Sequence, residues 1–128
     1  MVVRVVRLGS DRAPDEGTRV GTVRRPPRGV PKSQFASGNW YDVWFPNLAP
    51  SVETMKLGQA ATTPAQWAAF TRKYRSEMAR PEASHALELL AALSRGSNFS
   101  VGCYCENEDH CHRSVLRALL AEKGAAVA

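Results

Sequence analysis

The sequence predicts an α/β fold, a single domain in which a mixed or parallel sheet is flanked by helices in Rossmann-like layers. Two observations predict it. Strand-like segments lie in the first quarter of the chain and again at residues 99–105, and amphipathic segments with helix-capping signals follow one another in the second half. The length suits one domain over residues 1–128, because domains typically hold roughly 100–150 residues.

Three segments have the composition of strands. Val2–Leu8 is rich in valine and has no breaker, Thr18–Arg25 is stopped by two prolines, and Phe99–Cys105 is largely apolar. We expect all three in one sheet. The aromatic segment Trp40–Phe45 is either a short strand or an irregular apolar loop.

Helix signals lie in the second half. Thr63 is a favourable N-cap before Pro64, and Gln66 completes a capping box. Further helices are expected from Pro81 and over Cys111–Lys123. The apolar positions expected to face the core are Trp67, Phe70, Tyr74 and Met78, then Leu87, Leu90 and Leu93, and finally Leu116, Leu119 and Leu120.

The net charge of +5 is concentrated in the first quarter of the chain. Residues 1–35 carry eight Lys or Arg against three Asp or Glu, whereas residues 36–128 carry nine of each. Seven of the eight are arginine, whose guanidinium fork binds oxyanions bidentately. This favours a discrete anion site over a general polyanion surface. Arginines solvated at strand edges and loops explain the surplus equally well.

Membrane-spanning segments, signal peptides and cysteine positions each bear on where the protein is located. No apolar run approaches the roughly 18 residues that span a membrane, and the N-terminus lacks the pattern of a signal peptide. We therefore expect a soluble, cytoplasmic protein with no membrane partner. All three cysteines lie within nine residues, which does not suit a secreted disulfide framework. They are expected to be free thiols, metal ligands or a redox site.

The segment 103–113 holds these cysteines and is the strongest candidate site. It is predicted to run from the end of a strand through a loop into a helix, where α/β sheets bind ligands. Cys103 and Cys105 are expected on one face of the strand, and Cys111 and His112 at the first turn of the helix. Free amides there favour an anion or a thiolate.

Four interpretations of this segment stay open. Its donors suit a zinc or iron centre, although their spacing matches no standard zinc finger; they are Cys103, Cys105, Cys111 and either His112 or His110. Cys111 is a candidate nucleophile or redox group. The residues that directly follow it contain no glycine, so they do not resemble the phosphate-binding loop of a cysteine phosphatase. His112, Arg113 and the helix amides, with N-terminal arginines, could instead bind an anion. The cysteines could also be simple buried apolar residues.

The three cysteines are expected to differ in burial and in how readily their thiols ionise. Cys111 should be the most thiolate-like because of its position at a helix start, and Cys103 should be more buried and less reactive. Cys105 should be intermediate, and could form a disulfide with Cys111 only if their Cα atoms approach within roughly 7 Å.

Several motifs together resemble a known family. They are Gly17-Thr18-Arg19-Val20, Pro27-Arg28-Gly29-Val30 with Lys32, Trp44 with Leu48-Ala49-Pro50-Ser51, Trp67 with Phe70 and Tyr74-Arg75, and Cys111-His112-Arg113 before Leu116. With them the chain resembles the domain of unknown function 488 family, particularly its YeaO-like members. The resemblance implies an α/β fold with the last strand-loop-helix unit, and no established reaction.

Three positions depart from the YeaO-like pattern. Val23 stands in place of an acidic residue, Pro26 in place of an aromatic one, and Cys111 in place of asparagine before the histidine. His112, Arg24 and Arg28 are therefore the better carriers of a role shared across the family.

The leading hypothesis is a small enzyme or binding domain for an anionic small molecule or nucleotide-like ligand. Its candidate catalytic residues are Cys111 and His112, and its candidate ligand-binding residues are Arg24, Arg28, Arg113 and Tyr104. His112 is interpreted as an acid/base group or anion donor, within reach of Arg24 or Arg28 across a cleft. One alternative is a nucleic-acid-binding module that stacks bases on Trp40, Tyr41 and Trp44. Another is a metal-stabilised (zinc or iron) interaction domain.

Overall fold

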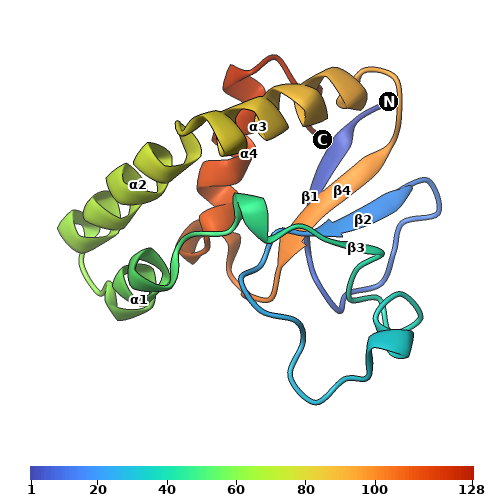
Figure 1. The fold of residues 1–128 in the computed structure, drawn as a ribbon, viewed down its shortest axis with the longest axis horizontal. Helices are drawn as coiled ribbons and strands as arrows, with labels where there is room; N and C mark the ends of the chain where they lie inside the picture. The colour runs from blue at the N-terminus through green and yellow to red at the C-terminus, as the bar shows by residue number, and fades with distance from the viewer.

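The computed structural model describes residues 1–128 and contains one four-stranded sheet (Figure 1). Its strands are β1 (Val3–Arg7), β2 (Thr18–Gly21), β3 (Val43–Trp44) and β4 (Phe99–Cys103), in the order β1-β4-β2-β3. Every neighbouring pair is parallel, so the predicted α/β fold is confirmed. The predicted strands are confirmed with shorter ends, and the aromatic segment contributes the short edge strand β3.

Four α-helices accompany the sheet. They are α1 (Val52–Ala60), α2 (Pro64–Met78), α3 (Pro81–Ser94) and α4 (His112–Glu122), with 3-10 turns at Lys32–Gln34, Pro46–Leu48 and Glu108–His110. In Figure 1 the helices gather on one side of the strands, and the long β2–β3 connection extends away from them. None of the helices combines the length and apolar character that crossing a membrane requires.

Local sequence explains where α2 begins. The backbone N–H of Gln66 donates to the Thr63 hydroxyl, and the Thr63 N–H donates to the Gln66 side chain, which is the predicted capping box of α2. Cys111 is the N-cap of α4, one residue before its predicted place in the helix.

The helix α1 is not among the helices predicted from the sequence. Only Thr54 of this helix is buried, so it lacks the apolar stripe that marks an amphipathic helix. Its N-terminus is instead held by polar contacts. Ser51 caps it, and the Glu77 carboxylate of α2 accepts hydrogen bonds from the Ser51 and Thr54 hydroxyls at 2.6 and 2.8 Å.

The main core lies between one face of the sheet and the helices. Its fully buried members include Val3 and Val101 from the strands and Tyr74, Leu116 and Leu120 from the helices. The inward positions predicted for α2 and α4 are confirmed for Phe70, Tyr74, Met78, Leu116, Leu119 and Leu120.

The predicted inward position of Leu93 in α3 is wrong. Leu93 is 45% exposed, whereas Ala91 and Ser94 are buried. The face of α3 that meets the core therefore includes small residues, which allow close approach to its neighbours. The prediction was based on the spacing of the leucines and did not consider small residues such as Ala91 and Ser94 as core positions.

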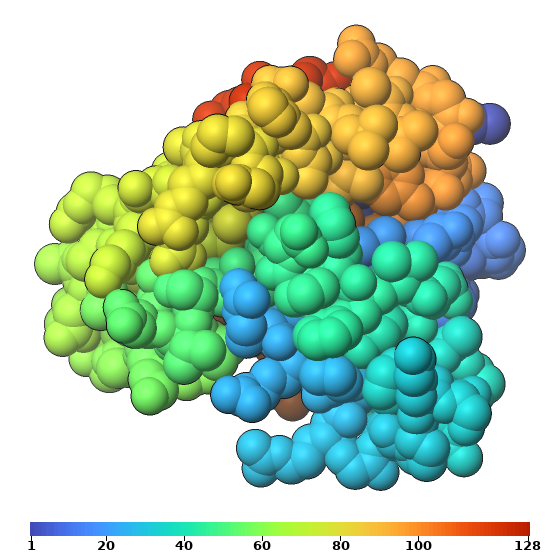
Figure 2. Space-filling model, in the orientation of Figure 1, coloured from blue at the N-terminus to red at the C-terminus, as the bar shows by residue number.

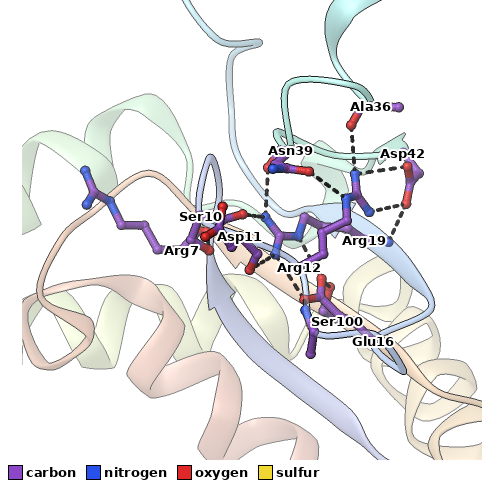
Figure 3. A network of polar contacts seen from close by, with 11 residues as sticks. Arg7, Ser10, Asp11, Arg12, Glu16, Arg19, Ala36, Asn39, Asp42 and Ser100 are labelled. Carbon is purple, nitrogen blue, oxygen red and sulfur yellow. Dashed lines mark hydrogen bonds and ion pairs between the residues drawn. The ribbon is translucent and has the colours of Figure 1, made fainter.

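The opposite face of the sheet carries a buried ion pair (Figure 3). Arg19 of β2 has no exposed surface, and its guanidinium donates two hydrogen bonds to the Glu16 carboxylate at 2.7 and 3.0 Å. Glu16 also accepts from the Ser100 hydroxyl of β4. The remaining donors of Arg19 reach the carbonyls of Ser10 and Asn39, so this residue joins two loops to the sheet.

This pair makes stability depend on pH. Burial raises the pKa of Glu16, but the hydrogen bonds and charge of Arg19 outweigh it, and the pKa lies below its ordinary value. A depressed pKa stabilises the fold above the unfolded pKa and loses that contribution as pH falls through the folded pKa. We expect urea unfolding to show a larger loss for Glu16→Gln at pH 7 than at pH 3. An equal loss of stability at both pH values would contradict this.

Candidate functional site

A cleft of about 750 Å³ opens at the C-terminal ends of the strands. Residues 7–10 after β1, 23–28 after β2 and 103–105 after β4 line it, together with residues of α1 and α2. The volume lies within the range of roughly 300–1,000 Å³ that small-molecule sites occupy. Figure 2 shows the segment after β2, in blue, lying beside α1, in green, on this side of the molecule.

Four arginines line the cleft, and no aspartate or glutamate does. They are Arg7, Arg24, Arg25 and Arg28. Arg25 and Arg28 are exposed, and their guanidinium groups make no hydrogen bond or ion pair within the chain. Guanidinium groups without internal partners keep their donors for a ligand, so the cleft is suited to an anion.

The other two cleft arginines are partly engaged. Arg24 donates from Nε to the Pro50 carbonyl at 3.2 Å and from Nη2 to the Ala49 carbonyl at 3.1 Å, which ties the β2–β3 connection to the segment before α1. Arg7 forms an exposed ion pair with Glu106 at 3.5 Å. Arg24 therefore shapes the wall of the cleft as well as charging it.

The rest of the N-terminal arginines have structural partners. Arg4 pairs with Asp15, Arg12 with Asp42 and Arg19 with Glu16. The surplus charge of residues 1–35 is thus divided between internal ion pairs and the cleft.

His112 lies at the cleft wall, at the first position of α4. Its Nε2 is 2.8 Å from the Thr22 carbonyl, which can only accept, so the ring carries its proton there. Burial lowers the pKa of His112 to about 4, despite the opposing effect of this hydrogen bond. The imidazole is therefore neutral at pH 7. Its Nδ1 carries the lone pair and is an acceptor, while the Nε2–H is engaged by the Thr22 carbonyl; the role of His112 as an acid/base group or anion donor stays a prediction.

Two of the cysteines are joined. Cys103 at the end of β4 and Cys111 before α4 form a disulfide, and each is 2% exposed. The expectation that Cys103 is more buried than Cys111 is wrong, because both pack in one small apolar cluster with Leu8, Val23 and Tyr41. Cys105 is exposed and free instead of intermediate, since β4 ends two residues before it. The thiolate character predicted for Cys111 stays a prediction for the reduced protein.

The four-donor metal site is not assembled. The donor atoms of Cys103, Cys111 and His112 all lie within 4.8 Å of one another, but Cys105 and His110 are outside this group. Cys105 lies beyond the strand, and the His110 ring packs edge-on against Trp67. Three donors, from the end of β4 and the start of α4, are what the fold brings together.

Of the two further residues predicted to bind the ligand, Tyr104 lines the cleft and Arg113 does not. Arg113 is buried, donates from Nη2 to the Cys105 carbonyl at 2.6 Å, and does not line the cleft. It holds the loop after β4. Tyr104 does line the cleft, and its hydroxyl donates to the Arg25 carbonyl at 2.8 Å. Burial raises the pKa of Tyr104, so the phenol stays protonated at neutral pH.

The three aromatic residues considered for base stacking do not form one surface. Trp40 lines the cleft and meets Tyr104 edge-to-face at 6.0 Å. Tyr41 is buried, and Trp44 is exposed on the edge strand β3. Trp67, which was not considered for base stacking, also lines the cleft, and its ring stacks on that of Phe70 with the centroids 4.6 Å apart. The spacing of Trp67 from the other apolar residues of α2 predicted a core position, and no sequence pattern indicated that it would line a cleft.

Val23 explains one departure from the YeaO-like pattern. It is 4% exposed and packs in the apolar cluster that contains both disulfide-bonded cysteines. A carboxylate there would be buried among apolar groups without a partner, so valine suits this site.

Comparison with known proteins identifies the family. No curated protein and no solved structure matches the chain significantly. The family model DUF488-N3a, described as the active DUF488-N3 subclade, matches residues 3–124. Nearly the whole chain, including every strand and the cleft, falls within this match, and the resemblance drawn from the motifs is confirmed at the level of the family. The chain therefore belongs to the DUF488-N3a family.

Proposed function

We propose that the cleft binds an anionic small molecule with a nucleotide-like structure. The observation that carries this proposal is that four arginines and no carboxylate line one cleft of small-molecule size. The guanidinium groups of Arg25 and Arg28, which have no partner within the chain, attract a phosphate or carboxylate and can bind it bidentately.

The aromatic residues support a nucleotide over a bare anion. Trp40, Trp67 and Tyr104 line the same cleft as the arginines. Nucleotides combine a charged phosphate with a flat base, and aromatic side chains bind the base face by stacking. The cleft therefore offers both kinds of group that such a ligand requires.

The structure favours this proposal over an extended nucleic-acid surface. Three of the N-terminal arginines are used in internal ion pairs, and Tyr41 is buried. The arginines that remain gather at a cleft rather than along a stripe. A duplex or long single strand is usually bound by a continuous basic face.

The family that the chain matches is described as an active subclade, so we also consider chemistry in the cleft. Within the cleft, His112 is the group most suited to it, because its imidazole is neutral and has a free acceptor nitrogen.

Calorimetric titration with ADP, pyrophosphate and adenosine tests the proposal. We expect ADP to bind most tightly and Arg28→Met to weaken its binding by roughly 10- to 100-fold, since one hydrogen bond to a charged group is worth roughly 1.5–3 kcal/mol. Arg95→Met is the matched control, because Arg95 is exposed at the end of α3 and outside the cleft. Equal losses for the two variants, or no binding of any of the three probes, would overturn the proposal.

A salt series separates the cleft from a polyanion surface. ADP affinity should fall only modestly between 50 and 200 mM salt, whereas a protein that contacts many phosphates loses roughly 10³–10⁵ in affinity over that range. Tight binding of a single-stranded oligonucleotide with that steep salt dependence, and weak binding of ADP, would favour the nucleic-acid alternative.

A further inference from the structure

The disulfide-bonded cysteines and His112 form a cluster of metal-binding groups at the cleft wall. The sulfurs of Cys103 and Cys111 and the ring nitrogen of His112 lie within 4.8 Å of one another. The Cys111 sulfur is 3.9 Å from His112 Nδ1. Two parts of the chain supply these groups, the end of β4 and the residues at the start of α4.

The spacing is close to what one metal ion requires. With Zn–S near 2.3 Å and Zn–N near 2.0–2.1 Å, a sulfur and a nitrogen on one tetrahedral zinc lie about 3.6 Å apart. The distance of 3.9 Å between Cys111 and His112 needs only a small adjustment. We propose that the reduced protein binds one Zn²⁺ through Cys103, Cys111 and His112.

The orientation of His112 suits a ligand. The Nε2–H donates to the Thr22 carbonyl, which fixes the ring and leaves Nδ1 facing the Cys111 sulfur at 3.9 Å. Histidines that bind metals usually donate their other ring N–H to a carbonyl or carboxylate in this way. Here that partner is present before any metal binds.

The proposed site has an open position. Three protein ligands leave one tetrahedral position free, which is typical of catalytic zinc sites rather than structural ones. Cys103 and His112 both line the arginine cleft, so a ligand in the cleft would have access to the bound zinc. A phosphate oxygen held by the arginines could reach the zinc, or a zinc-bound water could face the bound anion. The metal site goes beyond the proposed anion binding and does not depend on it.

Metal binding and the disulfide exclude each other. In the disulfide both sulfurs are bonded together, and neither is a thiolate. A phosphine reductant with one water converts the disulfide into two thiols and becomes the phosphine oxide. The sulfurs must then move apart to about 3.8 Å, and both thiols lose their protons to bind zinc.

Zinc titration of the full chain, before and after phosphine reduction, tests the proposal by competition with a chromophoric chelator. We expect one zinc per reduced chain and none per oxidised chain. Cys103→Ser and Cys111→Ser should each weaken binding by more than about 100-fold, because losing only a partner of a ligand costs roughly 10–100-fold. Cys105→Ser is the matched control and should retain full zinc affinity, since Cys105 is outside the cluster.

Cobalt provides a measurement on the wild-type chain, should a serine variant fail to fold. Reduced protein with one Co²⁺ should show thiolate-to-cobalt charge transfer and the intense visible bands of a tetrahedral ion. Adding pyrophosphate should shift the visible bands if the fourth position is open. Equal zinc affinity of Cys103→Ser and wild type, or cobalt bands without thiolate charge transfer, would overturn the proposal.

Discussion

Arg19→Met should lower the free energy of unfolding by about 3–5 kcal/mol, the usual cost of removing one partner of a buried ion pair. The Glu16 carboxylate is 2% exposed and receives two hydrogen bonds from Arg19. Without the guanidinium it keeps the Ser100 hydroxyl as a partner but has no charge to balance it. A domain of this size is stable by only about 5–15 kcal/mol, so the loss is a large share of the total.

Urea unfolding with two further variants isolates the cause. Arg19→Met combined with Glu16→Gln should cost less than the sum of the single changes, because the buried charge disappears with its partner. Arg75→Met removes an exposed ion pair with Glu122 and should cost under about 1 kcal/mol. If Arg19→Met costs no more than Arg75→Met, the buried pair does not stabilise the fold in the way we describe.

Gly17→Ala should destabilise the protein by about 3 kcal/mol or more. Gly17 has φ of +77°, where a side chain costs roughly 1–2 kcal/mol. A Cβ there would also lie 2.0 Å from the carbonyl oxygen of Asn98, which is backbone and cannot rotate away. Asn98 precedes β4, and its side chain accepts a hydrogen bond from the Val2 N–H, so relieving the contact would disturb the start of the sheet.

Gly29→Ala is the matched control for this substitution. Gly29 has a similar φ of +75°, but a Cβ there would meet no atom within 4 Å. It should therefore cost only about 1–2 kcal/mol, from the backbone conformation alone. The difference between the two variants in urea unfolding measures the collision with Asn98. Equal losses would show that the backbone conformation explains both.

The local signals that the sequence carries were sufficient for most of the fold. The strands β1, β2 and β4 and the helices α2, α3 and α4 follow from apolar periodicity and from caps, which act over a few neighbouring residues. The helix α1 lacks that periodicity, and its N-terminus is held instead by Glu77 of another helix, which no local pattern shows. The choice of Ala91 over Leu93 as a core residue likewise depends on how closely α3 approaches its neighbours.

By itself, the sequence determined the α/β class, the family, the arginine surplus of residues 1–35 and the cysteine-histidine segment near a helix start. Only the tertiary structure decided which arginines pair internally and which line the cleft, because their partners lie on other elements. It also decided that Cys103 joins Cys111 while Cys105 stays free. The physical reason is that the end of β4 and the position of α4 against the sheet bring Cys103 and Cys111 together. Contacts between residues distant in sequence determine both of these features.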